Sequence, residues 1–378
     1  MRKNFSNAEA PPSNQEEVEG LDNSQSEGWG GDYPLDAVFV RTETRTVQEV
    51  VKRIKAGRYQ LDPDFQRDFV WPVDKQSRLI ESCVMRVPLP VFYVAEAKDG
   101  RIAVVDGLQR LTTFNRFLAD EFSLILRADE DQPAHPLDGK KYGELPLLLQ
   151  ERIEDTQLTL YILDAKAPER AKLDIFERVN SGVSLTRQQM RNCLFNGPAT
   201  QWLKKASKNP EFLSASGRSL DSKSMRDREA INRFCAFYLI GEEKYSGGDM
   251  DAFLARALEK MQKESTDLDQ LYSTFTYSMK VNRYLFGNHA FRKSLEHCEA
   301  LASRTVLNIA LFDVCSVLLA DIDKDIINNN TQALREMFSS LIKDAVFNHA
   351  ITYSTNSTRQ VKKRFEMARV AISKALYV

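Results

Sequence analysis

The sequence predicts an α+β protein in which a mixed part with strands and helices is followed by an all-α-helical part. Between residue 46 and about residue 200, short apolar runs of strand length alternate with apolar residues at helical spacing. From residue 186 onward the helical spacing continues almost to the end of the chain. The 378 residues, of which 43 % are hydrophobic, suffice for two domains that each bury a core. A single small binding module and a globally disordered protein are excluded.

The first 34 residues differ in composition from the rest. They contain Ser, Asn, Gln, Gly and Pro, few large apolar side chains, and seven acidic residues against Arg2 and Lys3. Such a segment buries too little apolar surface to offset the entropy of ordering it. We therefore expect a disordered acidic arm over 1–34, a mixed domain over 35–200 and a helical domain over 201–378. The chain as a whole has 52 basic and 53 acidic residues. This near-neutral total combines an acidic arm with a mildly basic remainder.

Residues that typically start or end helices and strands predict where each element of this chain lies. Capping residues and first-turn prolines mark helix starts, glycines mark helix ends, and Asp-Gly steps mark strand ends. The mixed part is expected to contain a helix from Thr46 to Gly57, an extended piece at 59–61, a helix after Pro72, a hairpin of strands 91–95 and 102–105, a helix after Gly107, a strand at 158–163 and a helix from Pro168. The helical part is expected to contain helices near 186–195, 225–240, 249–263, 268–284, 289–301, 304–322, 331–347 and 358–376.

Several classes of protein are excluded or disfavoured by what the sequence lacks. The five cysteines are scattered singly, without the spacing of a zinc site. No apolar signal-peptide region follows the first residues, and the longest apolar stretch, 306–320, is interrupted by Asn308 and Asp313. No G-x-x-x-x-G-K-[ST] phosphate loop occurs. We expect a cytoplasmic protein that does not enter a membrane.

The sharpest local feature is a strand that ends in Asp106-Gly107-Leu108-Gln109-Arg110, followed by a helix. Glycine permits a tight strand-to-helix turn, and the unpaired N–H groups and positive dipole end of a helix attract an anion. Arg110 adds a forked donor suited to phosphate oxygens, and Asp106 could hold Mg²⁺ or orient a water. A generic Asp-Gly turn without function is the alternative.

Two more polar clusters flank this feature in the chain. The first is Asp64-Phe65-Gln66-Arg67-Asp68 before Phe69 and Trp71, which suggests a loop held between apolar anchors or an ordinary salt-bridged turn. The second is the stretch 176–192, in which Arg178 and Arg191 lie on either side of a turn and could converge on an anion. Helix capping explains the other polar residues of this turn, but not the arginines.

Together, the three clusters resemble the N-terminal domain family of GmrSD-type restriction systems, also catalogued as domain of unknown function 262. The matching strings, which lie within about residues 45–200, are Asp64-Phe65-Gln66-Arg67 with Val70-Trp71, Asp106-Gly107-Leu108-Gln109-Arg110-Leu111-Thr112-Thr113, and Phe176-Glu177-Arg178-Val179-Asn180-Ser181-Gly182 with Arg191-Asn192. The resemblance implies a ParB/sulfiredoxin-like fold that binds and hydrolyses a nucleoside triphosphate with Mg²⁺ in bacterial restriction of phage or modified DNA.

The resemblance also assigns roles to residues. Asp106, Gln109, Arg110 and Gln66 would be catalytic, with Asp106 also the Mg²⁺ ligand. The residues expected to bind the nucleotide are Arg67, Gly107, Thr112, Arg178, Asn180 and Arg191. Leu108 stands where the family usually has a glutamine, which makes hydrolysis less secure than phosphate binding.

Other functions remain open at this stage. A non-catalytic DNA-sensing or regulatory module with the same fold is one alternative. A metal-dependent nuclease is another, resting on two carboxylate-lysine strings, Asp155…Asp164-Ala165-Lys166 and Asp227…Glu242-Glu243-Lys244. A basic last helix with Lys362, Lys363 and Arg364 suggests DNA phosphate contacts, or simply a solvated amphipathic helix. Expected partners are a nucleotide, DNA and a separate nuclease subunit, and the chain could form oligomers.

Overall fold

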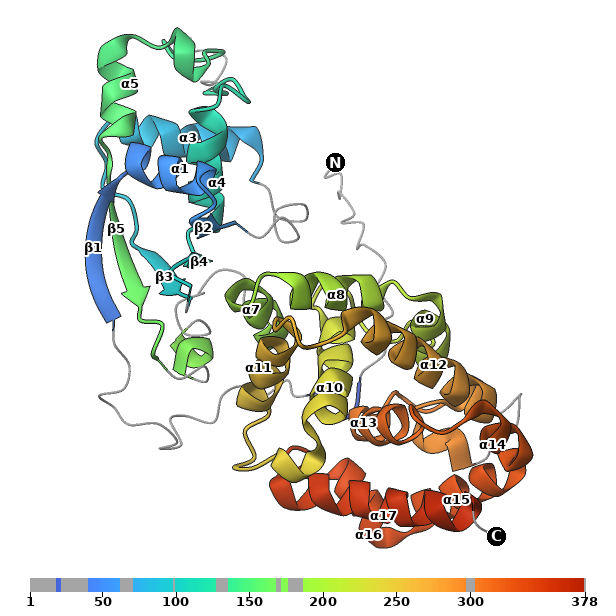
Figure 1. The fold of residues 1–378 in the computed structure, drawn as a ribbon. Helices are drawn as coiled ribbons and strands as arrows, with labels where there is room; N and C mark the ends of the chain where they lie inside the picture. The colour runs from blue at the N-terminus through green and yellow to red at the C-terminus, as the bar shows by residue number, and fades with distance from the viewer. Residues whose placement is uncertain are drawn as a thin grey trace, which may run out of the picture. The chain divides into compact units, whose positions relative to one another are not determined.

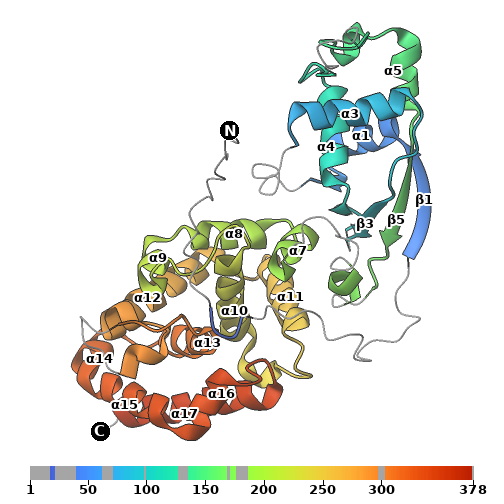
Figure 2. The same cartoon turned by 180° about the vertical axis from the view of Figure 1, so that it is seen from behind.

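The computed structural model describes residues 18–21, 40–61, 71–97, 99–126, 135–167, 171–175, 186–296 and 303–376. The chain divides into two compact units. Residues 24–201 form one unit, which contains a mixed sheet, and residues 202–378 together with 1–23 form the other, which is helical (Figures 1 and 2). The predicted α+β class with an all-α C-terminal part is confirmed. Along the described residues, no helix is both long enough and apolar enough to cross a membrane.

A five-stranded sheet forms the centre of the first unit. Its strands have the order β1-β5-β3-β4-β2 and are β1 (Val40–Thr46), β2 (Tyr59–Gln60), β3 (Phe92–Glu96), β4 (Ile102–Asp106) and β5 (Gln157–Leu163). The β1/β5 and β3/β4 pairs are antiparallel, whereas β3/β5 and β2/β4 are parallel. Strand β1 was not predicted from the sequence, because its threonines alternate with charged residues rather than apolar ones. Pairing with β5 along all seven residues makes it a strand.

Most helices of this unit begin at or next to a predicted start, but the helix at 147–154 was not predicted. They are α1 (Val47–Lys55), α3 (Val73–Val84), α4 (Leu108–Phe117), α5 (Leu147–Glu154) and α7 (Arg187–Leu194). The Thr46 hydroxyl accepts the Glu49 N–H at 3.2 Å at the start of α1. Pro72 precedes the first helical residue of α3 rather than occupying it. Its fixed φ still suits a helix entry.

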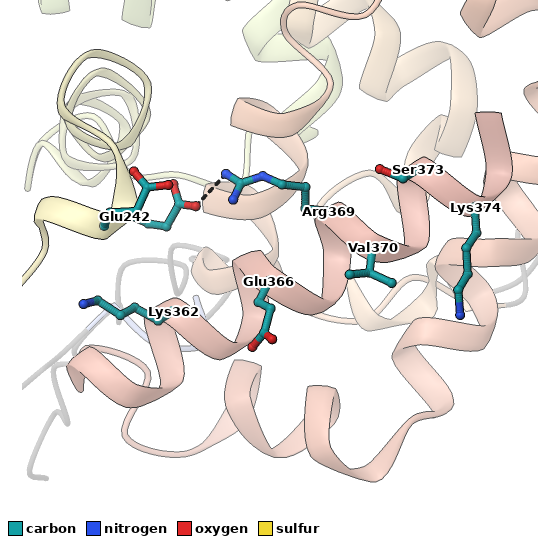
Figure 3. Close-up of a pocket in the computed structure, with 8 residues that line it drawn as sticks. Glu242, Lys362, Glu366, Arg369, Val370, Ser373 and Lys374 are labelled. Atoms are coloured by element: carbon teal, nitrogen blue, oxygen red, sulfur yellow. Dashed lines mark hydrogen bonds and ion pairs between the residues drawn. The ribbon is translucent and has the colours of Figure 1, made fainter. Parts of the chain in front are cut away.

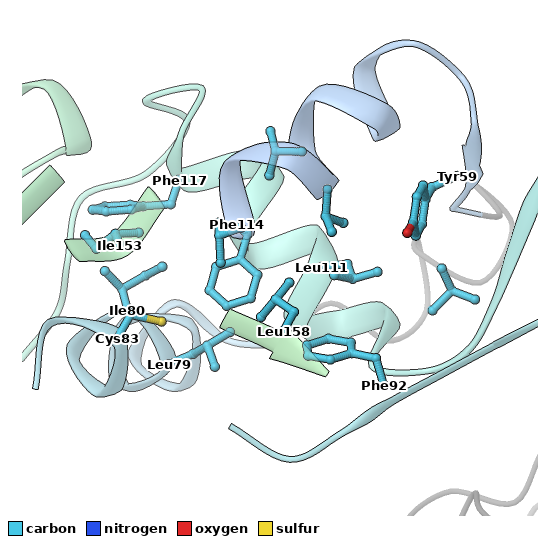
Figure 4. Close-up of a cluster of buried hydrophobic side chains, with 14 of the residues drawn as sticks. Tyr59, Leu79, Ile80, Cys83, Phe92, Leu111, Phe114, Phe117, Ile153 and Leu158 are labelled. Carbon is cyan, nitrogen blue, oxygen red and sulfur yellow. The ribbon is translucent and has the colours of Figure 1, made fainter. Parts of the chain in front are cut away.

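Apolar side chains cover both faces of the sheet. On one face, α1, α3, α4 and α5 enclose a large core, part of which is drawn in Figure 4: Tyr59, Leu79, Ile80, Cys83, Phe92, Leu111, Phe114, Phe117, Ile153 and Leu158. On the other face, Leu173 and Met190 pack on Ala95, Val105 and Leu163. Because β4 is covered on both sides, its C-terminal end at Asp106 is held in a fixed position.

The second unit is built from helices. They are α8 (Pro198–Ser207, which spans the division between the units), α9 (Pro210–Ser216), α10 (Arg226–Ile240), α11 (Met250–Met261), α12 (Leu268–Phe286), α13 (Ile309–Leu318), α14 (Lys324–Asn329), α15 (Thr331–Lys343), α16 (Ala345–Thr352) and α17 (Thr358–Leu376).

Two of the expected helices are corrected. The helix expected at 289–301 is absent from its described part, where short 3-10 turns occur and Phe291 has a positive φ of 63°. The helix expected at 331–347 ends at Lys343, and Asp344 caps α16 by accepting the N–H groups of Val346 and Phe347. The apolar residues keep helical spacing across 331–347, but the Asp344 cap ends one helix and starts the next.

Three helices of this unit meet at a buried charge cluster. Asp313 of α13 accepts two hydrogen bonds from Arg233 of α10, from Nε at 2.9 Å and from Nη2 at 2.6 Å. It accepts a third from Nη2 of Arg364 of α17 at 2.8 Å. All three side chains are buried. Burial lowers the pKa of Arg364 to about 10, although Asp313 opposes the shift. One carboxylate thus holds two guanidinium groups away from water.

The N-terminal arm contains a short packed segment, which differs from the expectation of disorder over residues 1–34. Val18–Leu21 lie against the helical unit, and both Val18 and Leu21 are buried. These two apolar side chains interrupt an otherwise polar stretch and give the segment something to bury. The other residues expected to form the arm lie outside the described residues.

Candidate functional site

The first cluster forms a tight turn between β4 and α4. Gly107 has φ of +98° and is the N-cap of α4. A Cβ at this position would lie 2.3 Å from Cδ1 of the buried Phe92, so only glycine fits. The turn leads directly from Asp106, whose side chain is 40 % exposed, into the first turn of α4, where N–H groups have no intrahelical acceptors.

Gln109 connects this turn to the end of the second cluster. Its Oε1 accepts the Trp71 backbone N–H at 3.0 Å. Gln76 donates to the Trp71 carbonyl at 2.6 Å, and Lys75 lies 4.4 Å from the centre of the Trp71 ring. Trp71 directly follows the segment that carries Gln66 and Arg67, and both of these residues lie outside the described residues. The chain just after that segment is thereby fixed to the first turn of α4.

The third cluster reaches the same strand from the other face of the sheet. Helix α7 packs on β4, with Met190 against Val105. Thr186 and Gln189 form the capping box that starts α7, with hydrogen bonds of 3.2 and 2.7 Å. Arg178 and Asn180 lie outside the described residues. The described parts of all three clusters therefore converge on β4 and the turn that follows it.

Arg110 has a different role from the expected one. Its guanidinium donates to the carbonyl of Pro90, to the carbonyl of Val91 at 3.0 Å and to Asp106 Oδ2 at 3.2 Å. It lies 4.1 Å from the centre of the Phe92 ring, and the residue is only 8 % exposed. Burial lowers the pKa of Arg110, and the nearby Asp106 carboxylate opposes this shift. The guanidinium that was expected to bind phosphate therefore bonds to the residues just before β3 and to Asp106.

Arg191 is likewise directed inward. It is 1 % exposed, and its Nε donates to Gln188 Oε1 at 2.9 Å. Gln188 in turn donates to Asn192 at 3.0 Å. Arg191 therefore lies inside a buried network, and its expected role in binding the nucleotide stays a prediction. Its charge could not reveal this, because burial is decided by packing.

On the buried side of α4, two side-chain oxygens lack hydrogen-bond partners among the described residues. They are Oγ1 of Thr112 and Oδ1 of Asn115, one turn further along the helix. A buried polar atom left unpaired costs free energy, which a ligand or an ordered water would relieve. Thr112 is one of the residues expected to bind the nucleotide. The orphan oxygen leaves that expectation open.

A pair of tyrosines next to Asp106 was not anticipated. Tyr93 of β3 is the cross-strand partner of Asp106, and Tyr161 of β5 is the partner of Tyr93. Their ring centres lie 5.4 Å apart, and both residues are half-buried. The signal in the sequence was a polar-tipped aromatic within each largely apolar strand.

The expected Mg²⁺ can be tested against these residues. Mg²⁺ in nucleotide sites is usually held by one or two carboxylates, substrate phosphates and waters. Asp106 supplies one partly exposed carboxylate at the turn, held by Arg110. Within the described ranges, no group of three His, Cys, Asp or Glu side chains could hold a metal ion by itself. The site therefore fits a metal ion that arrives with a phosphate ligand.

The family model of the GmrSD restriction endonuclease N-terminal domain matches residues 47–196. This part of the chain belongs to that family. The match includes all three clusters, so the resemblance inferred from their residues is confirmed. It associates the chain with restriction-type systems. No curated protein matches the chain.

Neither carboxylate-lysine string, one in the GmrSD domain and one in the helical unit, assembles a metal centre from the described residues. Asp164 accepts the backbone N–H of Lys166 at 2.8 Å, as in a simple turn. Asp227 is 6 % exposed and accepts the Arg228 N–H at 2.7 Å. Glu242 pairs with Arg369 at 2.5 Å. The contacts of Asp164, Asp227 and Glu242 are thus a turn, a local backbone hydrogen bond and an ion pair.

Asp227 nevertheless gives a pH-dependent prediction. Burial raises the pKa of Asp227 from its ordinary 3.8 to about 6. The folded state then binds more protons than the unfolded state between these values, so stability falls as the pH rises from about 4 to 6. We expect Asp227→Asn to increase the free energy of unfolding at pH 7.5 by up to about 3 kcal/mol, at 1.36 kcal/mol per pH unit. The gain should vanish below pH 4 in denaturant titrations.

Asp221, six residues earlier, is the matched control. Burial alone would raise the pKa of Asp221, but hydrogen bonds from Ser224 and Lys223 outweigh burial and lower it. Asp221→Asn should therefore destabilise the protein at pH 7.5, which is the opposite sign. Equal effects of the two substitutions would contradict the prediction.

Outside the GmrSD domain, the basic character of α17 is only partly as expected. Val361, Phe365, Ala368 and Ile372 are buried, which confirms the expected amphipathic pattern. Arg364, expected on the DNA-binding face, is instead fully buried on Asp313, so that assignment is corrected.

The exposed side of α17 carries both signs of charge. Lys363 pairs with Glu366 at 3.3 Å. A hollow lies between α17 and the 3-10 turn Glu242–Lys244 (Figure 3). Its lining includes the basic Lys362, Arg369 and Lys374 together with the acidic Glu242, Glu243 and Glu366. These described residues therefore do not form a uniformly positive face for binding phosphates.

Proposed function

We propose that the GmrSD domain of this chain binds a nucleoside triphosphate with Mg²⁺ at the start of α4 and hydrolyses it, as part of a restriction-type phage-defence system. The observation that carries the proposal is the hydrogen bond from the Trp71 N–H to Gln109, which joins two clusters distant in sequence at this turn. Helix α7 brings the third cluster to the same strand. Such a convergence of motifs on one strand and the turn that follows it is typical of a binding site.

Phosphates would lie against the first-turn N–H groups of α4, where the helix dipole favours negative charge. Asp106, oriented by Arg110, would hold the metal or the attacking water. Gln109 accepts from Trp71 through Oε1, which leaves its Nε2 group positioned to donate to a phosphate or a water. When bound, Mg²⁺ would neutralise charge on the phosphate oxygens. The family resemblance assigns the remaining contacts to Gln66, Arg67, Arg178 and Asn180.

The two tyrosines supply a surface for the nucleobase. Tyr93 lies one strand spacing from Asp106, and Tyr161 lies one spacing further, at about 4.8 Å per strand. Aromatic side chains stack on any base without reading its edges. A nucleotide with its phosphates at Gly107 could therefore extend across the sheet onto these rings.

We expect Asp106→Asn to lower Mg²⁺-dependent phosphate release roughly 100-fold, which is typical for loss of a group that orients the reacting water. Nucleotide binding should persist, because the helix N-terminus remains. The assay is phosphate release from a panel of nucleoside triphosphates, with binding measured separately by calorimetry. Arg110→Ala is a poor probe, because it also removes the brace on Pro90 and Val91.

Asp99→Asn is the control for this test. Asp99 lies in the β3–β4 hairpin, its side chain is 49 % exposed, and it pairs with Arg101. The variant should release phosphate as fast as the unchanged protein. Failure of the unchanged protein to bind any triphosphate would overturn the proposal. Full activity of Asp106→Asn would remove Asp106 from the mechanism.

Binding without phosphate release would favour the second candidate, a non-catalytic module that senses DNA or regulates a partner. Leu108 supports this candidate, because it replaces a carboxamide in the family pattern with a side chain that cannot bond to a phosphate or a water. In either case, we propose that the nucleotide state is passed to DNA or to a separate nuclease subunit in the cytoplasm. DNA cleavage by added nuclease subunits, with and without nucleotide, would test this coupling.

A further inference from the structure

Residues Val18–Leu21 contact the helical unit through a bridge at Glu19, after which the chain turns at Gly20. The Glu19 N–H donates to the Leu307 carbonyl at 2.8 Å, and the Glu19 carbonyl accepts the Ile309 N–H at 2.9 Å. Ile309 is the first residue of α13, and its N–H has no acceptor within the helix. The segment therefore completes the cap of α13 by a backbone pairing of the kind seen when a peptide adds to a strand.

Side chains make this contact selective. Lys293 Nζ lies 2.5 Å from Glu19 Oε1 and 2.8 Å from the Thr352 hydroxyl. Gly20 has φ of +83°, and a Cβ there would lie 3.0 Å from Cγ2 of Ile309. Val18 and Leu21 are each only 8 % exposed. The surface thus accepts an apolar residue, a glutamate, a glycine and an apolar residue in succession.

The contact is small compared with the entropy of ordering it. Only four residues are involved, and fixing each backbone residue opposes the gain from two hydrogen bonds, one partly exposed ion pair and two apolar side chains. Because the contact is this small, we expect a competing segment to displace it.

We propose that the surface formed by Lys293, Leu307–Ile309, Thr352 and Thr355 is a peptide-docking site. Its ligand is a short segment of the form apolar–Glu–Gly–apolar that turns at the glycine, and Val18–Leu21 occupy it as an internal ligand. A partner protein that presents such a segment binds by displacing residues 18–21. This inference does not depend on nucleotide binding by the GmrSD domain.

The test is titration of a fluorescein-labelled synthetic peptide with the sequence of residues 16–23 into the full-length protein, followed by fluorescence anisotropy. The Glu19→Lys protein, whose own segment is disabled while the surface is intact, should bind the peptide at least tenfold more tightly than the unchanged protein. A peptide with Gly20→Val should not bind, because of the contact with Ile309 and the left-handed backbone. Equal binding to both proteins, or no binding to Glu19→Lys, would overturn the proposal.

Charge reversal identifies the pairing within the site. The Lys293→Glu protein should not bind the unchanged peptide, but should bind a peptide with Glu19→Lys. Hydrogen exchange at the Ile309 amide gives an independent readout, because this N–H donates to the Glu19 carbonyl. Exchange should accelerate in the Glu19→Lys protein and slow again when the unchanged peptide is added. An Ile309 amide unaffected by either change would also contradict the proposal.

Discussion

Asp313→Ala is expected to destabilise the helical unit by about 3–5 kcal/mol, the cost of breaking a buried ion pair by removing one partner. Asp313 pairs with both of the buried arginines, Arg233 and Arg364. Its removal takes the shared counter-charge away from two guanidinium groups in a low-dielectric interior. Because these arginines come from α10 and α17, the loss affects helices distant in the sequence.

Hydrogen exchange of the α10 and α13 amides measures this effect in the full-length chain and separates it from unfolding of the GmrSD domain. Lys363→Ala is the matched control. Lys363 neighbours Arg364 in the sequence but belongs to an exposed pair with Glu366, and such pairs contribute about 0–1 kcal/mol. Asp313→Asn should destabilise the helical unit almost as strongly as Asp313→Ala. Although asparagine keeps the shape of the side chain, it removes the negative charge. Equal protection in Asp313→Ala and Lys363→Ala would refute the role given to this cluster.

Gly107→Ala is expected to lower the free energy of unfolding of the GmrSD domain by about 2–5 kcal/mol. The left-handed backbone costs roughly 1–2 kcal/mol for a residue with a side chain, and overpacking against the buried Phe92 costs roughly 1–3 kcal/mol more. The new methyl group would also lie 3.3 Å from Arg110 Nη2. The turn that positions Asp106 should be displaced, so nucleotide binding should weaken as well.

Gly57→Ala separates the two causes. Gly57 also has a positive φ, of +71°, but a Cβ there has no neighbour within 4 Å. Its substitution should cost only the backbone strain, and nucleotide binding should be unchanged. Denaturant titration of both variants gives the difference, which reports the contact with Phe92. The same loss of stability in both would show that Phe92 relaxes without cost.

Much of the local structure follows from the sequence. Thr46 and Thr186 cap helices where their spacing to Glu49 and Gln189 predicts, and Gly107 makes the turn expected of it. Such signals act over a few residues, so they survive whatever the rest of the chain does. Strand β1 escaped prediction because its stability comes from pairing with β5, more than a hundred residues away in the chain.

The candidate site divides in the same way. Side-chain types and their spacing along the chain are enough to predict the three clusters, their order and the family. What each charged group does depends instead on how the chain packs when it folds. Arg110 braces two carbonyls, Arg191 is buried in α7, and Arg364 neutralises Asp313 instead of facing DNA. The residue type does not show whether an arginine is solvated or buried. Only packing determines whether its donors face water, a ligand or the protein.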